Sequence, residues 1–337
     1  PQKGAELFKN GDYYGSERSL NAALKSKPDS RNVLSALASV MIFQGKHSQL
    51  ETILEPMIEK NENDISLHVL LLKAKIAGGR ASEALREASA LLKKDETNPE
   101  VIKMIARSYM ELGKLEMAEY VLKTLGETGK QADVLNMLGR IAMKKNEMQR
   151  AIEYFKEAVA LDPSLPDAHN NLGVLYQATG KDNEAISEFD AAINAWPAFE
   201  AAHMNIGNSY KRLMQFDKAL AAYNSALKFN PESADIYFNL GILYLEMKGG
   251  TPEEREKRCL EAISNFNKYK DLRKKGLPRD ELADKYIDEA NRIIDAVRKE
   301  KKSEEMKESE PKKEETPSVP DEKTEEKGDE KTEPEGF

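Results

Sequence analysis

The sequence contains a single cysteine, Cys259, so it cannot form an internal disulfide, and its cysteine usage gives no information on the redox compartment. No apolar run approaches the roughly 18–20 residues that a membrane-spanning helix needs, so we expect no transmembrane segment. The sequence pattern indicates no strands, so there is no strand for a glycine-rich phosphate loop to follow. The histidines are few and never pair at the spacing of zinc ligands: His47, His68, His169 and His203. These absences leave no sign of a metal site or a cofactor site.

The sequence has no excess of basic residues of the kind that nucleic-acid-binding proteins carry. The chain has 51 basic and 59 acidic side chains, a net charge of -8. Residues 303–337 carry 6 basic and 14 acidic side chains, so the rest of the chain is neutral, with 45 of each. Phosphate binding needs a basic face, so we expect no nucleic-acid partner. Residues 303–337 also have almost no apolar side chains, which predicts a disordered acidic tail.

A period of 34 residues dominates the sequence before this tail. Four glycines are each 34 residues apart: Gly139, Gly173, Gly207 and Gly241. Other small, aromatic and proline residues keep the same period: Ala151, Ala185 and Ala219; Phe155, Phe189 and Tyr223; Ala158, Ala192 and Ala226; Pro163, Pro197 and Pro231. A fixed period of this length is typical of a repeat architecture.

One period contains two amphipathic helices. The first carries an apolar stripe that includes Leu172 and Tyr176, and Gly180 breaks it. The second begins near Asn183 and ends at Pro197, because proline cannot continue a helix. Small residues in both helices favour close antiparallel packing. No unit of this size can bury its apolar face alone, so the units must stack.

This pattern resembles the tetratricopeptide repeat family, whose units are helix-turn-helix pairs of 34 residues. The resemblance covers about residues 1–276 and implies an all-α, right-handed superhelical solenoid. We count one truncated unit at the start and seven full units, which begin near residues 31, 65, 99, 132, 166, 200 and 234.

The end of the repeat region departs from the regular pattern. In the last unit the expected alanine and aromatic residue, Ala262 and Phe266, come nine residues late, after the insertion GGTPEEREK. Thr251 can cap a helix and Pro252 fits its first turn, so the insertion predicts a longer second helix. Residues 277–302 predict a capping helix whose apolar stripe would cover the last repeat: Leu282, Tyr286, Ala290, Ile293 and Val297.

The resemblance implies that the first helices line a concave surface. The residues expected to point inward are candidate partner-binding residues: Lys103, Arg107, Asn136, Arg140, Lys144, Asn170, Asn171, Asn205, Asn208, Lys211, Arg212 and Asn239. The basic members of this set favour acidic segments of a partner. The alternative is a solvated face of mixed charge, because acidic residues such as Asp133 and Asp167 lie nearby.

Three of these residues, Asn171, Asn205 and Asn239, are one period apart. They are similar to the asparagine ladder of the O-linked N-acetylglucosamine transferases, which implies binding to the backbone of an extended peptide. The alternative is that asparagine is only tolerated on a solvated helix face. The carboxylate clamp of chaperone-binding relatives needs an asparagine four residues after a lysine. Here Lys103 is followed by Arg107, so a chaperone-tail receptor is not favoured.

The only tryptophan, Trp196, occupies a turn where sister units have the polar residues Asp162 and Asn230. With Phe199, it indicates an exposed contact surface. The alternative is that Trp196 folds onto the adjacent helix.

Nearly every segment before residue 303 is used as a repeat helix or cap, which leaves no candidate catalytic residues. We therefore predict a non-catalytic scaffold that binds an extended peptide or a partner protein in its concave groove. The alternative is a structural subunit of a larger assembly, such as a bacterial envelope, pilus or motility complex, that uses its convex face and loops. An enzyme is the third interpretation, and it would need a site that the sequence does not reveal.

The chain starts inside a repeat and without methionine, which fits a truncated boundary or the removal of a signal segment. Bacterial assembly lipoproteins of pilus and gliding machineries are similar, so the cell envelope or periplasm is favoured over the cytoplasm, with membrane anchoring through a removed N-terminus. The acidic tail, tethered to the same chain, is expected either to compete for the groove or only to aid solubility.

Overall fold

The computed structural model describes residues 2–125, 131–273 and 278–309, and over these ranges the chain forms helices α1–α17 and no strand. The predicted all-α fold is confirmed. The first helices of the eight pairs are α1 (Gln2–Lys9), α3 (Arg31–Phe43), α5 (Ile65–Ala77), α7 (Pro99–Glu111), α9 (Ala132–Lys144), α11 (Pro166–Ala178), α13 (Glu200–Arg212) and α15 (Ala234–Glu246). The second helices are α2 (Tyr13–Ser26), α4 (His47–Lys60), α6 (Ala81–Leu92), α8 (Leu115–Lys123), α10 (Met148–Leu161), α12 (Asp182–Ala195), α14 (Phe216–Phe229) and α16 (Pro252–Leu272). The last helix is α17 (Pro278–Ser309).

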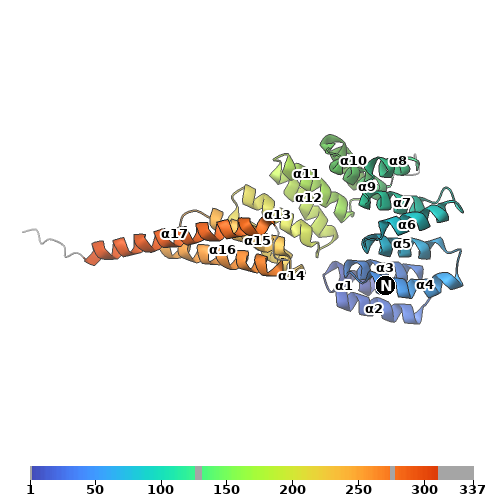
Figure 1. Ribbon diagram of the computed structural model, residues 1–337, viewed down its shortest axis with the longest axis horizontal. Helices are drawn as coiled ribbons and strands as arrows, with labels where there is room; N and C mark the ends of the chain where they lie inside the picture. The colour runs from blue at the N-terminus through green and yellow to red at the C-terminus, as the bar shows by residue number, and fades with distance from the viewer. Residues whose placement is uncertain (1, 126–130, 274–277, 310–337) are drawn as a thin grey trace, which may run out of the picture.

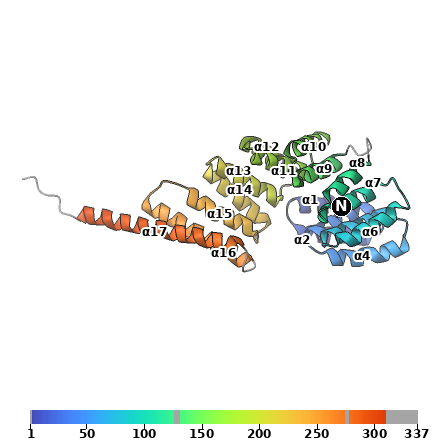
Figure 2. The ribbon, with the colours of Figure 1, turned by 45° about the horizontal axis from the view of Figure 1, so that its top comes forward.

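The helix pairs follow one another along a right-handed superhelical arc, from the blue units through green to yellow (Figures 1 and 2). The first helices of the seven full pairs begin at residues 31, 65, 99, 132, 166, 200 and 234, which are also the positions where the repeats start in the sequence. No helix in the described ranges is both long enough and apolar enough to cross a membrane.

A glycine in the first helix and an aromatic ring in the second set the packing of the later pairs. The ring of Phe189 lies against Gly173, and the ring of Tyr223 lies against Gly207. A Cβ at either glycine would lie 2.5 Å from the nearest ring carbon, closer than real contacts allow. The two rings are fully buried. The 34-residue period of these residues therefore reflects the contact that holds each pair together.

The insertion in the last unit forms part of a longer second helix, as predicted. Helix α16 has 21 residues and begins with a capping box in which Thr251 and Glu254 satisfy each other's backbone N–H groups. Tyr269, which stands where earlier units have alanine, is fully buried, and its ring centroid lies 5.1 Å from that of Phe238. The larger side chain thus fills space between the last repeat and α17.

Helix α17 covers the last pair, but it differs from the predicted cap in two ways. Its buried residues are Ala283, Ala290, Ile294 and Val297, whereas Leu282 is exposed. The helix also continues to Ser309, seven residues beyond the predicted boundary at Lys302. Just before this extension, ion pairs from Lys301 to α16, 2.9 Å to Glu253 and 3.1 Å to Glu256, hold α17 on its neighbour. The rest of the predicted tail, residues 310–337, lies outside the described residues, so its role stays a prediction.

The superhelix also closes on itself. The backbone N–H of Ala198, in the turn between α12 and α13, donates to the carbonyl oxygen of Lys9 at 2.9 Å. The rings of Trp196 and Phe8 stack with centroids 5.5 Å apart, and Phe43 meets Trp196 edge-on at 5.6 Å. We call the cluster of Phe8, Phe43, Trp196 and Phe199 the closure contact. It joins the first two units to a turn more than 150 residues away in the chain.

Candidate functional site

The inner wall carries a row of basic side chains at equivalent positions. Lys73, Arg107 and Arg140 are each the ninth residue of their helices, α5, α7 and α9. Arg107 and Arg140 were expected here from the sequence, whereas Lys73 was missed. The shared register, with spacings of 34 and 33 residues, is the signal that would have identified it.

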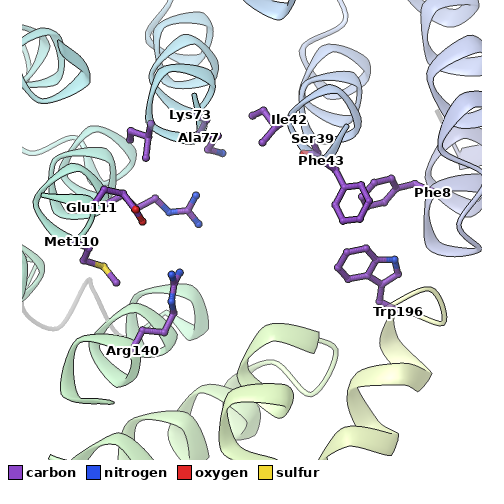
Figure 3. Close-up of a pocket in the computed structure, with 12 residues that line it drawn as sticks. Phe8, Ser39, Ile42, Phe43, Lys73, Ala77, Met110, Glu111, Arg140 and Trp196 are labelled. Carbon is purple, nitrogen blue, oxygen red and sulfur yellow. The ribbon is translucent and has the colours of Figure 1, made fainter. Parts of the chain in front are cut away.

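These three side chains line a cavity of about 600 Å³ at the centre of the arc. Figure 3 shows Lys73 and Arg140 on one side of it and the rings of Phe8, Phe43 and Trp196 on the other. The basic wall comes from consecutive units, whereas the aromatic wall is assembled by the closure contact. The cavity therefore has one charged and one apolar wall.

The basic wall lacks ion-pair partners in the part of the chain that the structure describes. No carboxylate there forms an ion pair with Lys73, Arg107 or Arg140, although Glu100 and Asp133 act on Lys73 and Arg107 from a longer distance. Burial and the neighbouring Arg140 lower the pKa of Arg107, and burial and Arg107 lower the pKa of Lys73. One acidic residue, Glu111, also lines the cavity, so the lining has a net positive charge. Such a site favours a negatively charged group.

Other basic residues predicted for the groove are paired with carboxylates instead. Lys103 is only 6% exposed and is paired with Glu100 and, at 2.7 Å, with Asp133. Burial opposes its charge, but hydrogen bonds to these two carboxylates outweigh burial, so the pKa of Lys103 is raised. The Nε atom of Arg212 lies 3.0 Å from Asp182. Lys103 and Arg212 are therefore paired within the chain, and their role in partner binding stays a prediction. Two further predicted cations do not line the cavity: Lys144 and Lys211.

The predicted asparagines bond to one another across neighbouring units. Asn171 Nδ2 donates to Asn136 Oδ1, and Asn205 Nδ2 donates to Asn170 Oδ1, each at 3.0 Å. These bonds give Asn171 and Asn205 a contact between units that neither interpretation named, although each amide keeps further hydrogen-bonding capacity. Two predicted asparagines lie outside this pairing. The Asn208 side chain accepts a hydrogen bond from the Tyr223 hydroxyl at 2.7 Å, and the Asn239 side chain has no hydrogen bond within the described ranges. Peptide binding by the ladder stays a prediction.

The aromatic turn makes a contact within the chain that neither sequence interpretation named. Trp196 is half-buried and packs on Phe8 and Phe43 of the first two units, and its role as a surface for a partner stays a prediction. Phe199 stacks on Trp196 with ring centroids 4.8 Å apart. An interpretation based on the repeat period could not find this contact, because it joins units distant in sequence.

In the ranges that the structure describes, histidine and carboxylate side chains form no further candidate site. His169 Nδ1 lies 2.7 Å from Glu188, and His169 Nε2 lies 3.1 Å from the carbonyl oxygen of Pro163, so this ring links α11 to α12 and to the preceding turn. Hydrogen bonding to Glu188 raises the pKa of His169. In the described part of the chain, no group of three or more histidine, cysteine, aspartate or glutamate side chains is placed to hold a metal ion.

Comparisons with known proteins identify the repeats. Family models described as TPR repeat and tetratricopeptide repeat match residues 139–180 and 215–248, residues 75–141, and residues 166–198. No curated protein matches the chain. The crystal structure of the APC/C hetero-tetramer Cut9-Hcn1 has a similar fold, with a TM-score of 0.65 at 19% identity over 86% of this chain. This chain spans 54%, about half, of that protein's length.

Two smaller proteins align with about half of this chain. A thermophilic TPR protein of Thermus thermophilus is 23% identical, with a TM-score of 0.46, over 53% of this chain and 97% of its own. YrrB, described as a TPR protein with an unusual peptide-binding site, is 21% identical, with a TM-score of 0.39, over 54% of this chain and 95% of its own.

Proposed function

From the finding that this chain is a tetratricopeptide repeat protein, we propose that it binds an extended segment of a partner protein along its concave inner wall. The repeats make the chain a protein–protein interaction scaffold, because proteins of this family bind protein or peptide partners. The family is typically non-catalytic, and we propose no reaction for this chain.

The central cavity is the observation that carries the proposal. It lies where the inner faces of α3, α5, α7 and α9 meet the closure contact. Equivalent positions of consecutive first helices face it, so an extended chain would meet similar groups at regular intervals. The cavity has a volume of about 600 Å³, and its three cations have no ion-pair partner among the described residues, which favours the binding of a negatively charged group there over a purely structural role.

A pair of alanine-to-tryptophan substitutions tests whether partners use this wall. Ala77 lines the cavity, so Ala77→Trp should fill it and remove bound partners. Ala160 is exposed on the second helix α10, away from the cavity, so Ala160→Trp is the matched control. We expect quantitative mass spectrometry of affinity-purified complexes to show loss of partners only with Ala77→Trp. Loss only with Ala160→Trp would contradict groove binding.

A second candidate is a structural subunit that uses its convex face. Large apolar side chains are exposed on the second helices α8 and α10, among them Tyr120 at 68% and Leu161 at 56%. Isolated exposed apolar residues are common on protein surfaces, so they support this candidate less strongly than the cavity supports the first. Partner loss with Ala160→Trp but not with Ala77→Trp would favour it.

A further inference from the structure

We propose that the central cavity binds one acidic side chain together with a directly adjacent aromatic or large aliphatic side chain of the same partner segment. The inference rests on the proposed function, because it names the chemistry of the segment that would lie on the inner wall. Its basis is the pairing of a basic wall with an aromatic wall across one cavity.

The basic wall fits a carboxylate. Two arginines and a lysine face the cavity at the same register in consecutive units, and among the described residues no carboxylate pairs with them. Guanidinium groups bind carboxylates through two parallel hydrogen bonds, which gives both strength and orientation. Burial is the main cause that lowers the pKa values of Lys73 and Arg107, and repulsion from the neighbouring arginine adds to it, so a bound anion would offset that repulsion.

The aromatic wall fits an apolar side chain. Phe43 is 50% exposed, which is high for a phenylalanine, and its ring is held between Phe8 and Trp196. Because neighbouring rings hold each other in place, this wall presents a rigid apolar surface at little entropic cost. Covering it with an aromatic or large aliphatic side chain would remove that surface from water.

The opposed walls explain why the two side chains should be adjacent in the partner. In an extended chain, successive side chains point in opposite directions. A segment that passes between the walls would therefore direct one residue to the basic wall and its neighbour to the aromatic wall. Trp196 belongs to a turn far from Phe8 and Phe43 in sequence, so the complete site exists only while the closure contact is made.

A random library of twelve-residue peptides displayed on phage, selected on the full chain, tests the inference. We expect enrichment of aspartate or glutamate directly next to phenylalanine, tyrosine, tryptophan or leucine. Selected sequences that lack tryptophan are then made as blocked synthetic peptides. Their binding is followed by the fluorescence of Trp196, which is the only tryptophan in the chain and lines the cavity.

The matched variants each replace one arginine by glutamine. Arg140→Gln should weaken binding about tenfold or more, because a hydrogen-bonded charge partner of the peptide is lost. Arg86→Gln removes the same charge from an exposed position of α6 outside the cavity and should leave the affinity unchanged. Replacing the acidic peptide residue by its amide should weaken binding to the wild type by about as much as Arg140→Gln does. The same peptide change should have little further effect on binding to Arg140→Gln. The peptide substitution keeps the test valid if the protein variant does not fold.

Three results would overturn the inference. The first is selected peptides without the acidic–apolar pair. The second is equal affinity of the wild type and Arg140→Gln for the same selected peptide. The third is a library that yields no binder. In each case the proposed function is judged separately, by whether Ala77→Trp removes natural partners, so the two can fail independently.

Discussion

Glu119, a single carboxylate on α8, joins three helices. Its oxygens lie 2.7 Å from Lys123, 2.8 Å from Lys145 and 2.8 Å from Arg150, and its side chain is only 12% exposed. Hydrogen bonds from Lys123, Lys145 and Arg150 lower the pKa of Glu119 to about 2. This residue therefore connects α8 to the next repeat through charge, beside the apolar contacts of the same helices.

The low pKa of Glu119 predicts how stability depends on pH. Its folded pKa is below the unfolded value of 4.5, so its contribution is complete above about pH 4.5 and is lost as the pH falls towards 2. We expect Glu119→Gln to cost about 2–3 kcal/mol at neutral pH and to flatten the acid side of the stability profile. Urea unfolding between pH 2.5 and 7 would measure both effects.

The control for this prediction is Glu116→Gln, since Glu116 is exposed on the same helix. It should leave stability and its pH dependence nearly unchanged. If the free energy of unfolding of Glu119→Gln equals that of the wild type at every pH, the Glu119 carboxylate does not stabilise the fold.

At the scale of helices, the two helices of a pair can approach closely because the first helix has a glycine, which carries no side chain, at the contact. A Cβ at Gly173 would overlap the ring of Phe189, with Cε1 at 2.5 Å and Cδ1 at 2.7 Å. Gly173→Ala should force α11 and α12 apart and cost about 1–3 kcal/mol, because overpacking a well-filled core strains it. The melting temperature, followed by circular dichroism, should fall.

A double substitution separates overpacking from other effects. If the ring of Phe189 is the obstacle, Phe189→Leu should partly relieve Gly173→Ala, and the cost of the double variant should be less than the sum of the single costs. Additive losses would mean that the new methyl group is accommodated without pressing on the ring.

The helix starts and caps can be predicted closely from the sequence, whereas features that depend on contacts between distant residues cannot. The period of 34 residues gives the helix starts, and the segment around Thr251 gives the capping box of α16, because both depend on neighbours within a few residues. The extension of α17 beyond Lys302 follows ion pairs between Lys301 and residues of α16. Such contacts lie about 45 residues apart in sequence and leave no periodic signal.

At the scale of the whole molecule, one wall of the cavity can be predicted from the sequence and the other cannot. The basic wall is readable from sequence, since Lys73, Arg107 and Arg140 share one register. The aromatic wall is not, because it requires the accumulated curvature of several units to bring Trp196 back to Phe8. The small rotation between repeats sets this curvature, and a repeat motif does not specify it closely enough. The ion pair between Lys103 and Asp133 could not be predicted from the repeat pattern either, because it joins residues of two different units.

Trp196→Ala tests whether the closure contact holds the superhelix in its closed form. The substitution removes the ring pairs with Phe8 and Phe43, worth together about 1–3 kcal/mol, while the helices on either side keep their own cores. Because few other contacts join the first unit to this turn, we expect the arc to open. Small-angle X-ray scattering should then show a larger radius of gyration, with an unchanged helical circular dichroism spectrum.

The matched control is Tyr120→Ala, which removes an aromatic ring that is 68% exposed on α8 and should leave the scattering profile unchanged. An opened arc would separate the aromatic wall from the basic wall, so Trp196→Ala should also lose affinity for peptides that carry the acidic–apolar pair. Tyrosine fluorescence or calorimetry would follow this binding once the tryptophan is gone. If the radius of gyration stays the same, the backbone bond from Ala198 to Lys9 and the packing of Gly11 on Phe229 hold the ring closed without the stacked rings.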